Sequence, residues 1–284
     1  MTTLVFDDVN MAIWNRLRTV LEDGDRYAPR GKPVTEVRGT AVAFDMAFPV
    51  CTLKERKLGY RFMCAEAAWI LSGDNRLETI KRYSPFIWEF SDDGFFYQGA
   101  YGPRIVDQLT YVCDMLADDP DTRQAVIDVW RPNPRPGRDI PCTLSFQFMI
   151  RGGALHCVQS MRSSDVWLGY PYDAFNASML SGYIMLLLRD RKERGRKDLR
   201  LGTHTMLVGS QHVYDKDMEL AQRVVGSPDA HVFEQPPFIP YEFASPQALI
   251  DHLWDLAAHD WFSLPHTGYL VKELYDHAAK KTES

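Results

Sequence analysis

Residues 139–148 read Asp-Ile-Pro-Cys-Thr-Leu-Ser-Phe-Gln-Phe, and residues 161–178 read Met-Arg-Ser-Ser-Asp-Val-Trp-Leu-Gly-Tyr-Pro-Tyr-Asp-Ala-Phe-Asn-Ala-Ser. Strand-like alternation over 143–150 and 154–161, on either side of Arg151-Gly-Gly153, predicts a β-hairpin. The apolar stretch 174–188 that follows predicts a long helix. The hairpin would return the chain to the cysteine and so gather a thiol, a guanidinium and two carboxylates in one polar cluster.

The rest of the chain mixes helical and strand-like patterns. Apolar residues at helical spacing predict helices over 9–22, 61–71, 101–116, 218–224 and 247–258. Strand-like alternation is found at 37–44, 124–129 and 203–210. Proline, glycine and aromatic residues predict loops at 28–33, 86–104 and 131–138. Because no internal repeat or linker is visible, this order favours a single α+β domain over residues 1–284.

Composition argues against several classes of protein. Hydrophobic residues make up 45% of the 284 residues, enough for a substantial core, and the net charge of −6 argues against direct nucleic-acid binding. No signal peptide is visible, and the apolar run at 184–188 is far too short to span a bilayer, so we expect a cytoplasmic protein without a membrane partner. The five cysteines lack Cys-x-x-Cys spacing, which predicts neither disulfides nor a metal site.

Cys142 is the candidate nucleophile among the cysteines. A free thiol is only slightly ionised near neutral pH, and a nearby guanidinium lowers its pKa by stabilising the thiolate. The hairpin makes Arg162 the natural neighbour; the alternative is a buried core cysteine with Arg162 as a surface charge. Glu66 interrupts an otherwise apolar helix, and it is either a solvent-facing glutamate or a buried carboxylate that relays protons.

Other polar side chains provide candidate contacts for a phosphorylated ligand. Arg30, Arg162 and Ser163 could hold a phosphate through charge-assisted hydrogen bonds, although any arginine alone could be a solvated surface group. His212 and Tyr214 are two residues apart, the spacing at which strand residues share a face, and could both contact a sugar hydroxyl. A core histidine is the alternative for His212.

Several short motifs resemble those of the thymidylate synthase family. The nucleophile of that family lies in a Pro-Cys pair, here Pro141-Cys142, and an Arg-Ser pair, here Arg162-Ser163, holds the nucleotide phosphate. Further blocks keep the family's order between about residues 28 and 220: Pro29-Arg30-Gly31, Glu66-Ala-Ala-Trp69 through Gly73-Asp74, Ile87-Trp88, Gly99-Ala-Tyr101-Gly102, Thr122-Arg123 and His212-Val-Tyr214. Each block is short, and their shared order makes the resemblance specific.

The resemblance implies a three-layer α+β fold in which a central mixed sheet forms a homodimer interface, with Arg123 serving the phosphate site of the other subunit. It implies a pyrimidine nucleoside monophosphate as substrate and 5,10-methylenetetrahydrofolate as cosubstrate. Cys142 would add to C6 of the ring, and Tyr101 with Glu66 would help to remove the C5 proton. The folate contacts would be Trp88, Asp165 and Glu66. The nucleotide contacts would be Arg30, Arg162, Ser163, Asp173, His212 and Tyr214.

Asp173 stands where the uracil-specific enzymes of the family carry asparagine. A carboxylate accepts a hydrogen bond from the C4 amino group of cytosine and repels the O4 of uracil. Asp173 therefore predicts a cytosine nucleotide, dCMP first and CMP second; the alternative is that Asp173 only caps a helix beginning at Ala174. Gln124 and Thr143 also depart from the family, which usually carries arginine and histidine there.

The expected product depends on what attacks the exocyclic methylene left on the ring after transfer. Methyl-transferring members close the site with a short apolar end, whereas residues 278–284 read Ala-Ala-Lys-Lys-Thr-Glu-Ser, and Asp139 precedes the nucleophile by three residues. A wetter site favours water and a 5-hydroxymethyl product, as in the dCMP and CMP 5-hydroxymethyltransferase branch. The alternatives are a dCMP 5-methyltransferase, a dUMP-using thymidylate synthase or hydroxymethylase, and a nucleotide-binding regulator without activity.

Overall fold

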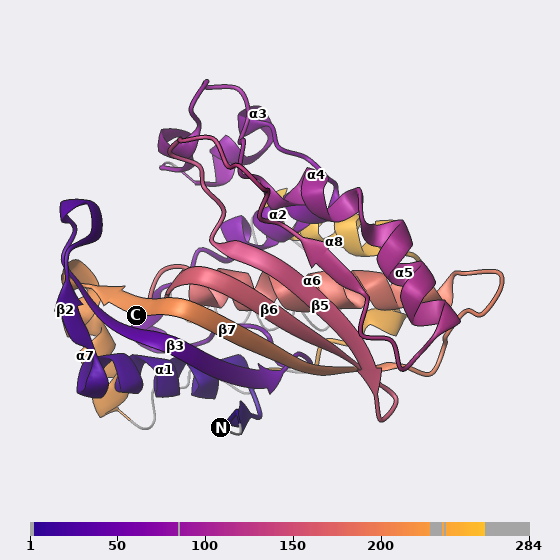
Figure 1. The fold of residues 1–284 in the computed structure, drawn as a ribbon, viewed down its shortest axis with the longest axis horizontal. Helices are drawn as coiled ribbons and strands as arrows, with labels where there is room; N and C mark the ends of the chain where they lie inside the picture. The colour runs from indigo at the N-terminus through magenta and orange to yellow at the C-terminus, as the bar shows by residue number, and fades with distance from the viewer. Residues whose placement is uncertain (1–2, 85, 228–234, 236, 259–284) are drawn as a thin grey trace.

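A mixed sheet runs across the molecule (Figure 1). The computed structural model describes residues 3–84, 86–227, 235 and 237–258. Within them, the sheet has seven strands: β1 (Val5–Phe6), β2 (Asp25–Tyr27), β3 (Val34–Asp45), β4 (Val126–Asp128), β5 (Thr143–Arg151), β6 (Ala154–Asp165) and β7 (Arg200–Tyr214). The order is β1-β3-β7-β6-β5-β4, with β2 paired to β3. The β6–β7 and β1–β3 pairs are parallel and the others antiparallel, which confirms the predicted mixed sheet.

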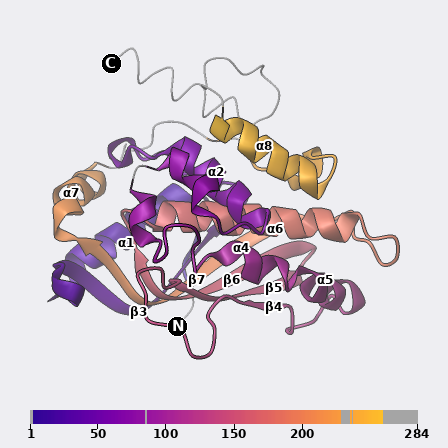
Figure 2. The ribbon, with the colours of Figure 1, turned by 90° about the horizontal axis from the view of Figure 1, so that it is seen from above.

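The helices gather on one face of this sheet (Figure 2). They are α1 (Val9–Asp23), α2 (Tyr60–Leu71), α3 (Leu77–Ile80), α4 (Tyr101–Val106), α5 (Leu109–Asp118), α6 (Tyr170–Arg189), α7 (Met218–Gly226) and α8 (Pro246–Ala258). Helix α6 is the most buried because apolar or small residues surround its axis on nearly every side. It packs against β6 and β7, while α2 and α8 pack against α6 and each other.

One continuous hydrophobic core contains residues from both the sheet and the helices. Tyr170 and Phe175 of α6 and Phe44 of β3 are among its largest fully buried side chains. The predicted single domain over residues 1–284 extends past the described residues and stays a prediction. Within the described part, no helix combines the length and apolar character needed to cross a bilayer.

The opposite face of the sheet carries no helix among the described residues (Figure 2). On β7 this face presents Thr203, Thr205 and Leu207, which alternate with the buried residues His204 and Met206. Leu207 is 40% exposed. This is the face on which the predicted homodimer interface would lie, and the dimer itself stays a prediction.

Most predicted elements are present, with differences at a few boundaries. The helix expected over 101–116 divides into α4 and α5, because the Gln108 side chain donates to the carbonyl of Arg104 at 2.6 Å and to that of Asp128 at 2.9 Å. Its Oε1 also accepts from the backbone N–H of Asp128, which ties the break to β4. The predicted loop 86–104 contains a short 3-10 turn, Ile87–Phe90.

Candidate active site

A cavity of about 490 Å³ opens beside the start of β5, between α2, α6 and the segments 84–101 and 138–142. Six of the predicted site residues line it: Arg30, Glu66, Tyr101, Cys142, Arg162 and Asp173. They come from six separate parts of the chain. The hairpin β5–β6 brings Cys142 and Arg162 together, as its pattern predicts. The backbone N–H of Arg162 donates to the carbonyl of Cys142 at 2.9 Å.

Cys142 differs from the other four cysteines in its exposure. Cys51, Cys64, Cys113 and Cys157 are buried, and burial raises the pKa of Cys113 and of Cys157 to about 12. Cys142 is only partly buried and faces the cavity. It is therefore the cysteine with access to a ligand.

The pKa of Cys142 is raised, whereas the neighbouring guanidinium was expected to lower it. Burial raises the pKa of this thiol above its ordinary value, and the charges of Arg162 and Arg30 only partly oppose that rise. The guanidinium of Arg162 also donates to the carbonyls of Pro141 at 2.9 Å and Ile140 at 3.0 Å. The resting thiol is thus protonated near neutral pH. Arg162 holds the segment before the nucleophile and stabilises a thiolate when one forms.

Glu66 of α2 turns toward the cavity and not toward solvent. Burial raises its pKa to about 7, so this carboxyl can exchange a proton near neutral pH. The Nδ2 of Asn176 on α6 donates to Glu66 Oε2 at 2.8 Å. The solvent-facing alternative for Glu66 is therefore wrong, and the carboxyl has the surroundings of a proton relay.

Asn176 is a site residue that the sequence reasoning missed. It lines the cavity, and its Oδ1 is buried without a hydrogen-bond partner among the described residues. It lies three residues after Asp173, and side chains at that spacing share one face of a helix. This helical spacing is the signal that could have found it.

Asp173 lies in the first turn of α6 and also faces the cavity. Burial raises its pKa well above the usual value, and the nearby carboxyls of Glu66 and Asp165 add to the shift. The helix begins at Tyr170, four positions earlier than expected, and Gly169 occupies the capping position. The alternative in which Asp173 caps a helix starting at Ala174 is therefore wrong.

The two arginines that reach the cavity form its cationic part. Arg30 sits in the 3-10 turn Pro29–Gly31 with φ of +55°, and neither its side chain nor that of Arg162 is paired with a carboxylate among the described residues. Two guanidiniums without a carboxylate partner beside one cavity are suited to bind an anion such as a phosphate.

Four other predicted nucleotide contacts do not line this cavity: Arg123, Ser163, His212 and Tyr214. Arg123 is exposed in the loop before β4. His212 is 8% exposed and meets Tyr214 edge to face, with ring centroids 5.1 Å apart. Their roles toward a ligand stay predictions.

Two of the predicted folate contacts, Trp88 and Asp165, do not line the cavity, although neighbours of Trp88 do. Phe86, Ile87 and Phe90 line it, whereas Trp88 between them is 57% exposed and does not. Asp165 lies outside the cavity, where its Oδ1 accepts from the backbone N–H groups of Trp167 and Leu168 at 2.9 and 3.0 Å. Asp165 thus stabilises the turn into α6, and its contact with a pterin stays a prediction.

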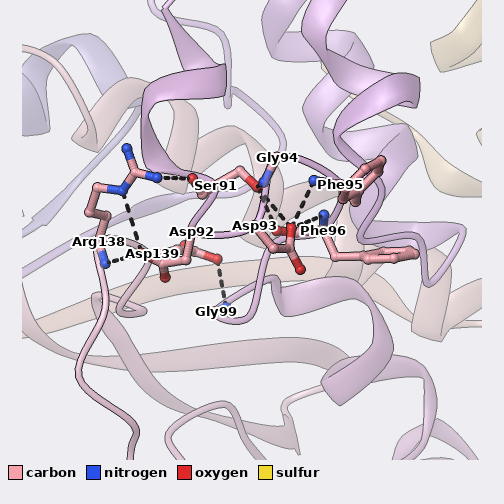
Figure 3. Close-up of polar contacts among 9 residues, drawn as sticks. All are labelled: Ser91, Asp92, Asp93, Gly94, Phe95, Phe96, Gly99, Arg138 and Asp139. Carbon is pink, nitrogen blue, oxygen red and sulfur yellow. Dashed lines mark hydrogen bonds and ion pairs between the residues drawn. The ribbon is translucent and has the colours of Figure 1, made fainter.

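Several hydrogen bonds tie the segment 131–141 to residues 91–99 beside the cavity (Figure 3). Asp139 accepts from the backbone N–H of Gly99 at 2.6 Å, and Asp92 accepts from that of Arg138 at 3.0 Å. A Cβ on Gly99 would lie 2.6 Å from the Asp139 carbonyl oxygen, so this approach requires glycine. Asp139 lines the cavity as expected, with its carboxylate engaged at the rim.

Comparison with known proteins now decides the family. The family model described as Thymidylate synthase matches residues 13–233, most of the chain. The chain belongs to the thymidylate synthase family. A deoxyuridylate hydroxymethyltransferase of Bacillus phage SP01 is 31% identical over 221 residues, which are 71% of this chain and 56% of that protein. This member of the thymidylate synthase family thus spans little more than half the length of that relative.

The described part of this thymidylate synthase family member has no group of three or more histidine, cysteine or acidic side chains arranged to hold a metal ion. The groups available for chemistry are instead the thiol of Cys142, the phenol of Tyr101 and the carboxyls of Glu66 and Asp173. The Tyr101 oxygen accepts a hydrogen bond from the backbone N–H of Thr143 at 3.1 Å, which places it next to the nucleophile.

Proposed function

We propose that this protein transfers a one-carbon unit from 5,10-methylenetetrahydrofolate to C5 of a cytosine nucleotide, dCMP first and CMP second, and releases a 5-hydroxymethyl product. The observation that carries the proposal is the convergence of Cys142, Tyr101, Glu66 and Asp173 on one cavity that also holds two arginines. Membership of the thymidylate synthase family supports the same chemistry.

The charges around the cavity suit a nucleoside monophosphate. Arg30 and Arg162 would hold the phosphate, while Asp173 and Glu66 would meet the polar edge of the base. The two arginines are also close enough to favour the thiolate of Cys142. A phosphate bound there would neutralise part of that charge, so the orientation of the nucleotide affects the reactivity of the thiol.

Covalent attack by Cys142 would start the reaction. Its sulfur forms a bond to C6, and the electrons of the C5–C6 double bond make C5 nucleophilic. Because burial keeps the resting thiol protonated, its proton must pass to a base or to water in the cavity as this bond forms. After C5 has taken the one-carbon unit, Tyr101 would help to remove the C5 proton, and Glu66 can pass protons on because its pKa is about 7.

The apolar rim fits the flat ring of a folate. Phe86, Ile87 and Phe90 line the cavity, and Trp88 lies among them in sequence. When bound, the folate supplies the one-carbon unit. These side chains would orient its ring by stacking and apolar contact, at an opening that also admits water.

Water is the proposed acceptor for the methylene left on the ring. A polar carboxylate, Asp139, lines the cavity on the side of the segment that precedes Cys142, and the phage relative is named as a hydroxymethyltransferase. The polar end at 278–284 lies outside the described residues. Attack by water on this methylene restores the C5–C6 double bond and breaks the bond between C6 and the Cys142 sulfur, which gives a 5-hydroxymethyl product and tetrahydrofolate. Hydride transfer from the folate in place of water gives a methyl product and dihydrofolate.

A uracil nucleotide is the second candidate substrate. The phage relative is named for deoxyuridylate, and a neutral carboxyl carries one donor and one acceptor, which can pair with either base after a rotation. Asp173 favours cytosine where its ionised form meets the C4 amino group. Competition among dCMP, CMP and dUMP, with the product identified by mass spectrometry and the folate by absorbance, would decide both base and product.

Cys142→Ala tests the covalent chemistry, which also separates the enzyme from a nucleotide-binding regulator. We expect turnover to be lost while nucleotide affinity and the unfolding midpoint stay near those of the unmodified protein. Cys113→Ala, at a buried thiol of α5 outside the cavity, is the matched control and should keep turnover. Product formation by Cys142→Ala at a tenth or more of the original rate would rule out the covalent mechanism.

A further inference from the structure

A line of buried polar side chains crosses the sheet behind the cavity and ends at Tyr101. His204 Nε2 lies 2.9 Å from Gln159 Oε1, and Gln159 Nε2 donates to Thr143 Oγ1 at 2.8 Å. The backbone N–H of Thr143 then donates to the Tyr101 oxygen at 3.1 Å. The chain thus passes from β7 through β6 and β5 to α4.

These side chains are withdrawn from water. His204 and Thr143 are fully buried and Gln159 is 1% exposed. Burial lowers the pKa of His204 to about 3, so its imidazole is neutral at working pH. Because a carbonyl oxygen only accepts, the bond to Gln159 Oε1 places the imidazole proton on Nε2.

A polar chain of this kind costs stability that apolar side chains of similar shape would not. His204 Nδ1 has no hydrogen-bond partner among the described residues, and a buried polar group without a partner lowers stability. The ring of Phe44, a buried core residue, packs edge to face against His204. The arrangement therefore calls for a role other than packing.

The chain ends at an irregular point of the sheet. The register of β5 against β6 shifts between Thr143 and Ser145, a β-bulge directly after the nucleophile. At a bulge the ladder alone does not fix the direction of the extra residue. The residue left without a partner on β6 is Leu144, and the side-chain bond from Gln159 to the neighbouring Thr143 adds a constraint directly beside it.

We propose that Gln159 and His204 are positioning residues for proton transfer at C5. They hold Thr143 in place so that its N–H donates to the Tyr101 oxygen. The Tyr101 hydroxyl can then donate its own proton to a partner in the cavity. When the C5–H bond breaks, its proton goes to the Tyr101 oxygen, and the hydroxyl proton passes on toward Glu66. The inference rests on the proposed function, because it needs that reaction to occur.

Three substitutions would each interrupt this row of hydrogen bonds with little change of side-chain volume: Thr143→Val, Gln159→Leu and His204→Phe. We expect kcat to fall about tenfold to hundredfold through misplacement of Tyr101, with KM and the dissociation constant for the nucleotide changed less than about twofold. A nucleotide deuterated at C5 should show a larger primary isotope effect on kcat in these variants, because C5-proton removal becomes more rate-limiting. The double variant Gln159→Leu/His204→Phe should lose no more activity than the worse single variant, since both act through one chain.

Asn10→Leu is the control for lost stability. Asn10 of α1 is 2% exposed, accepts from the backbone N–H of Thr52 at 2.7 Å and does not line the cavity. It should lower the unfolding midpoint without changing the isotope effect. A folded Gln159→Leu protein with kcat within twofold of the original and an unchanged isotope effect would overturn the inference. Failure of the proposed function looks different, because the unmodified protein would then release no C5 proton from any pyrimidine nucleotide with folate.

Discussion

At the scale of single residues, burial sets the ionisation state of the cavity. Burial raises the pKa of Glu66 to about 7 and the pKa of Asp173 well above the usual value of an aspartate. It also raises the pKa of Cys142 above the ordinary value of a cysteine thiol. The cause is the same in each case, since removal from water disfavours the charged form. The site therefore rests with little negative charge opposite Arg30 and Arg162, a state suited to receive an anionic nucleotide.

Base preference is predicted to depend on Asp173. Asp173→Asn replaces a group that accepts from the C4 amino group with an amide that can donate to O4 and accept from N3–H. We expect the ratio of kcat/KM for dCMP to that for dUMP to fall by at least about tenfold, since mismatched buried polar groups cost on the order of 1–3 kcal/mol. Steady-state kinetics with each nucleotide measures this ratio.

Asp190→Asn is the matched control for this change. Asp190 lies at the far end of the same helix, where its side chain is 42% exposed and pairs with Arg189. The base preference of this variant should equal that of the unmodified protein. An unmodified protein that prefers dUMP, or an Asp173→Asn variant with unchanged preference, would refute the cytosine assignment.

The raised pKa of Glu66 predicts a pH-dependent contribution to stability. Its pKa rises from 4.5 to about 7, so protonation favours the folded state, and stability present below pH 4.5 is lost as pH rises through 7. Glu66→Gln stays neutral and can still bond to Asn176. Relative to the unmodified protein, its free energy of unfolding should be near equal at pH 5 and higher at pH 8, by up to about 3 kcal/mol. Urea denaturation at both pH values tests this, and an equal difference at the two would contradict it.

At the scale of elements, the rim of the cavity depends on a close approach of two loops. Gly99 packs against Asp139, and Arg138 bonds to Asp92 and to the carbonyl of Ser91 (Figure 3). The segment 131–141 contains no helix or strand and is therefore held by these contacts and by Pro141-Cys142 at its end. Loops fixed in this way can position catalytic groups that a sheet alone would not reach.

Gly99→Ala should therefore reduce both stability and activity. The added Cβ would meet backbone at 2.6 Å, an overlap that only movement of the rim can relieve, and we expect a loss of about 1–3 kcal/mol of unfolding free energy. Gly226→Ala, at the end of α7, is the control because nothing lies within 4 Å of its Cβ position. Chemical denaturation of the two variants should separate them, and equal stability would show that the rim moves freely.

At the scale of the whole molecule, all helices of the described part lie on one face of the sheet (Figure 2). The other face is a surface of small and apolar side chains around Leu207, which suits association with a second copy. Arg123 does not reach the cavity of its own chain. The proposed homodimer would give it a phosphate to bind.

Sedimentation at micromolar concentration should therefore give about twice the chain mass of 32.6 kDa. Leu207→Glu should shift the protein toward the monomer, because the new charge would be buried in the interface. Tyr111→Glu, at a 48% exposed position of α5 away from this face, is the control.

Mixing inactive Arg123→Ala with inactive Cys142→Ala should restore activity, since one site of the mixed dimer keeps both groups. A fully active monomer would exclude Arg123 from the site.

Much of the fold and the site could be predicted from local patterns. Alternation along β5 and β6 and the Gly-Gly turn between them predicted the hairpin that brings Arg162 to Cys142. The apolar run after Asp173 predicted α6, and the order of short motifs predicted the family. Each of these signals is carried by neighbouring residues or by their order, so no knowledge of distant contacts was needed.

The tertiary structure decided what depends on contacts between elements. The break at Gln108 requires β4 beside it, the pair Glu66–Asn176 requires α2 against α6, and the chain from His204 to Tyr101 crosses four elements. The direction of the pKa shift at Cys142 could not be predicted from the sequence either, because it depends on the balance between burial and the charges of two arginines. The sequence by itself determined the elements, the motifs and the family, whereas burial and cross-element distances, which no local period encodes, determined the proton states and partners of the site.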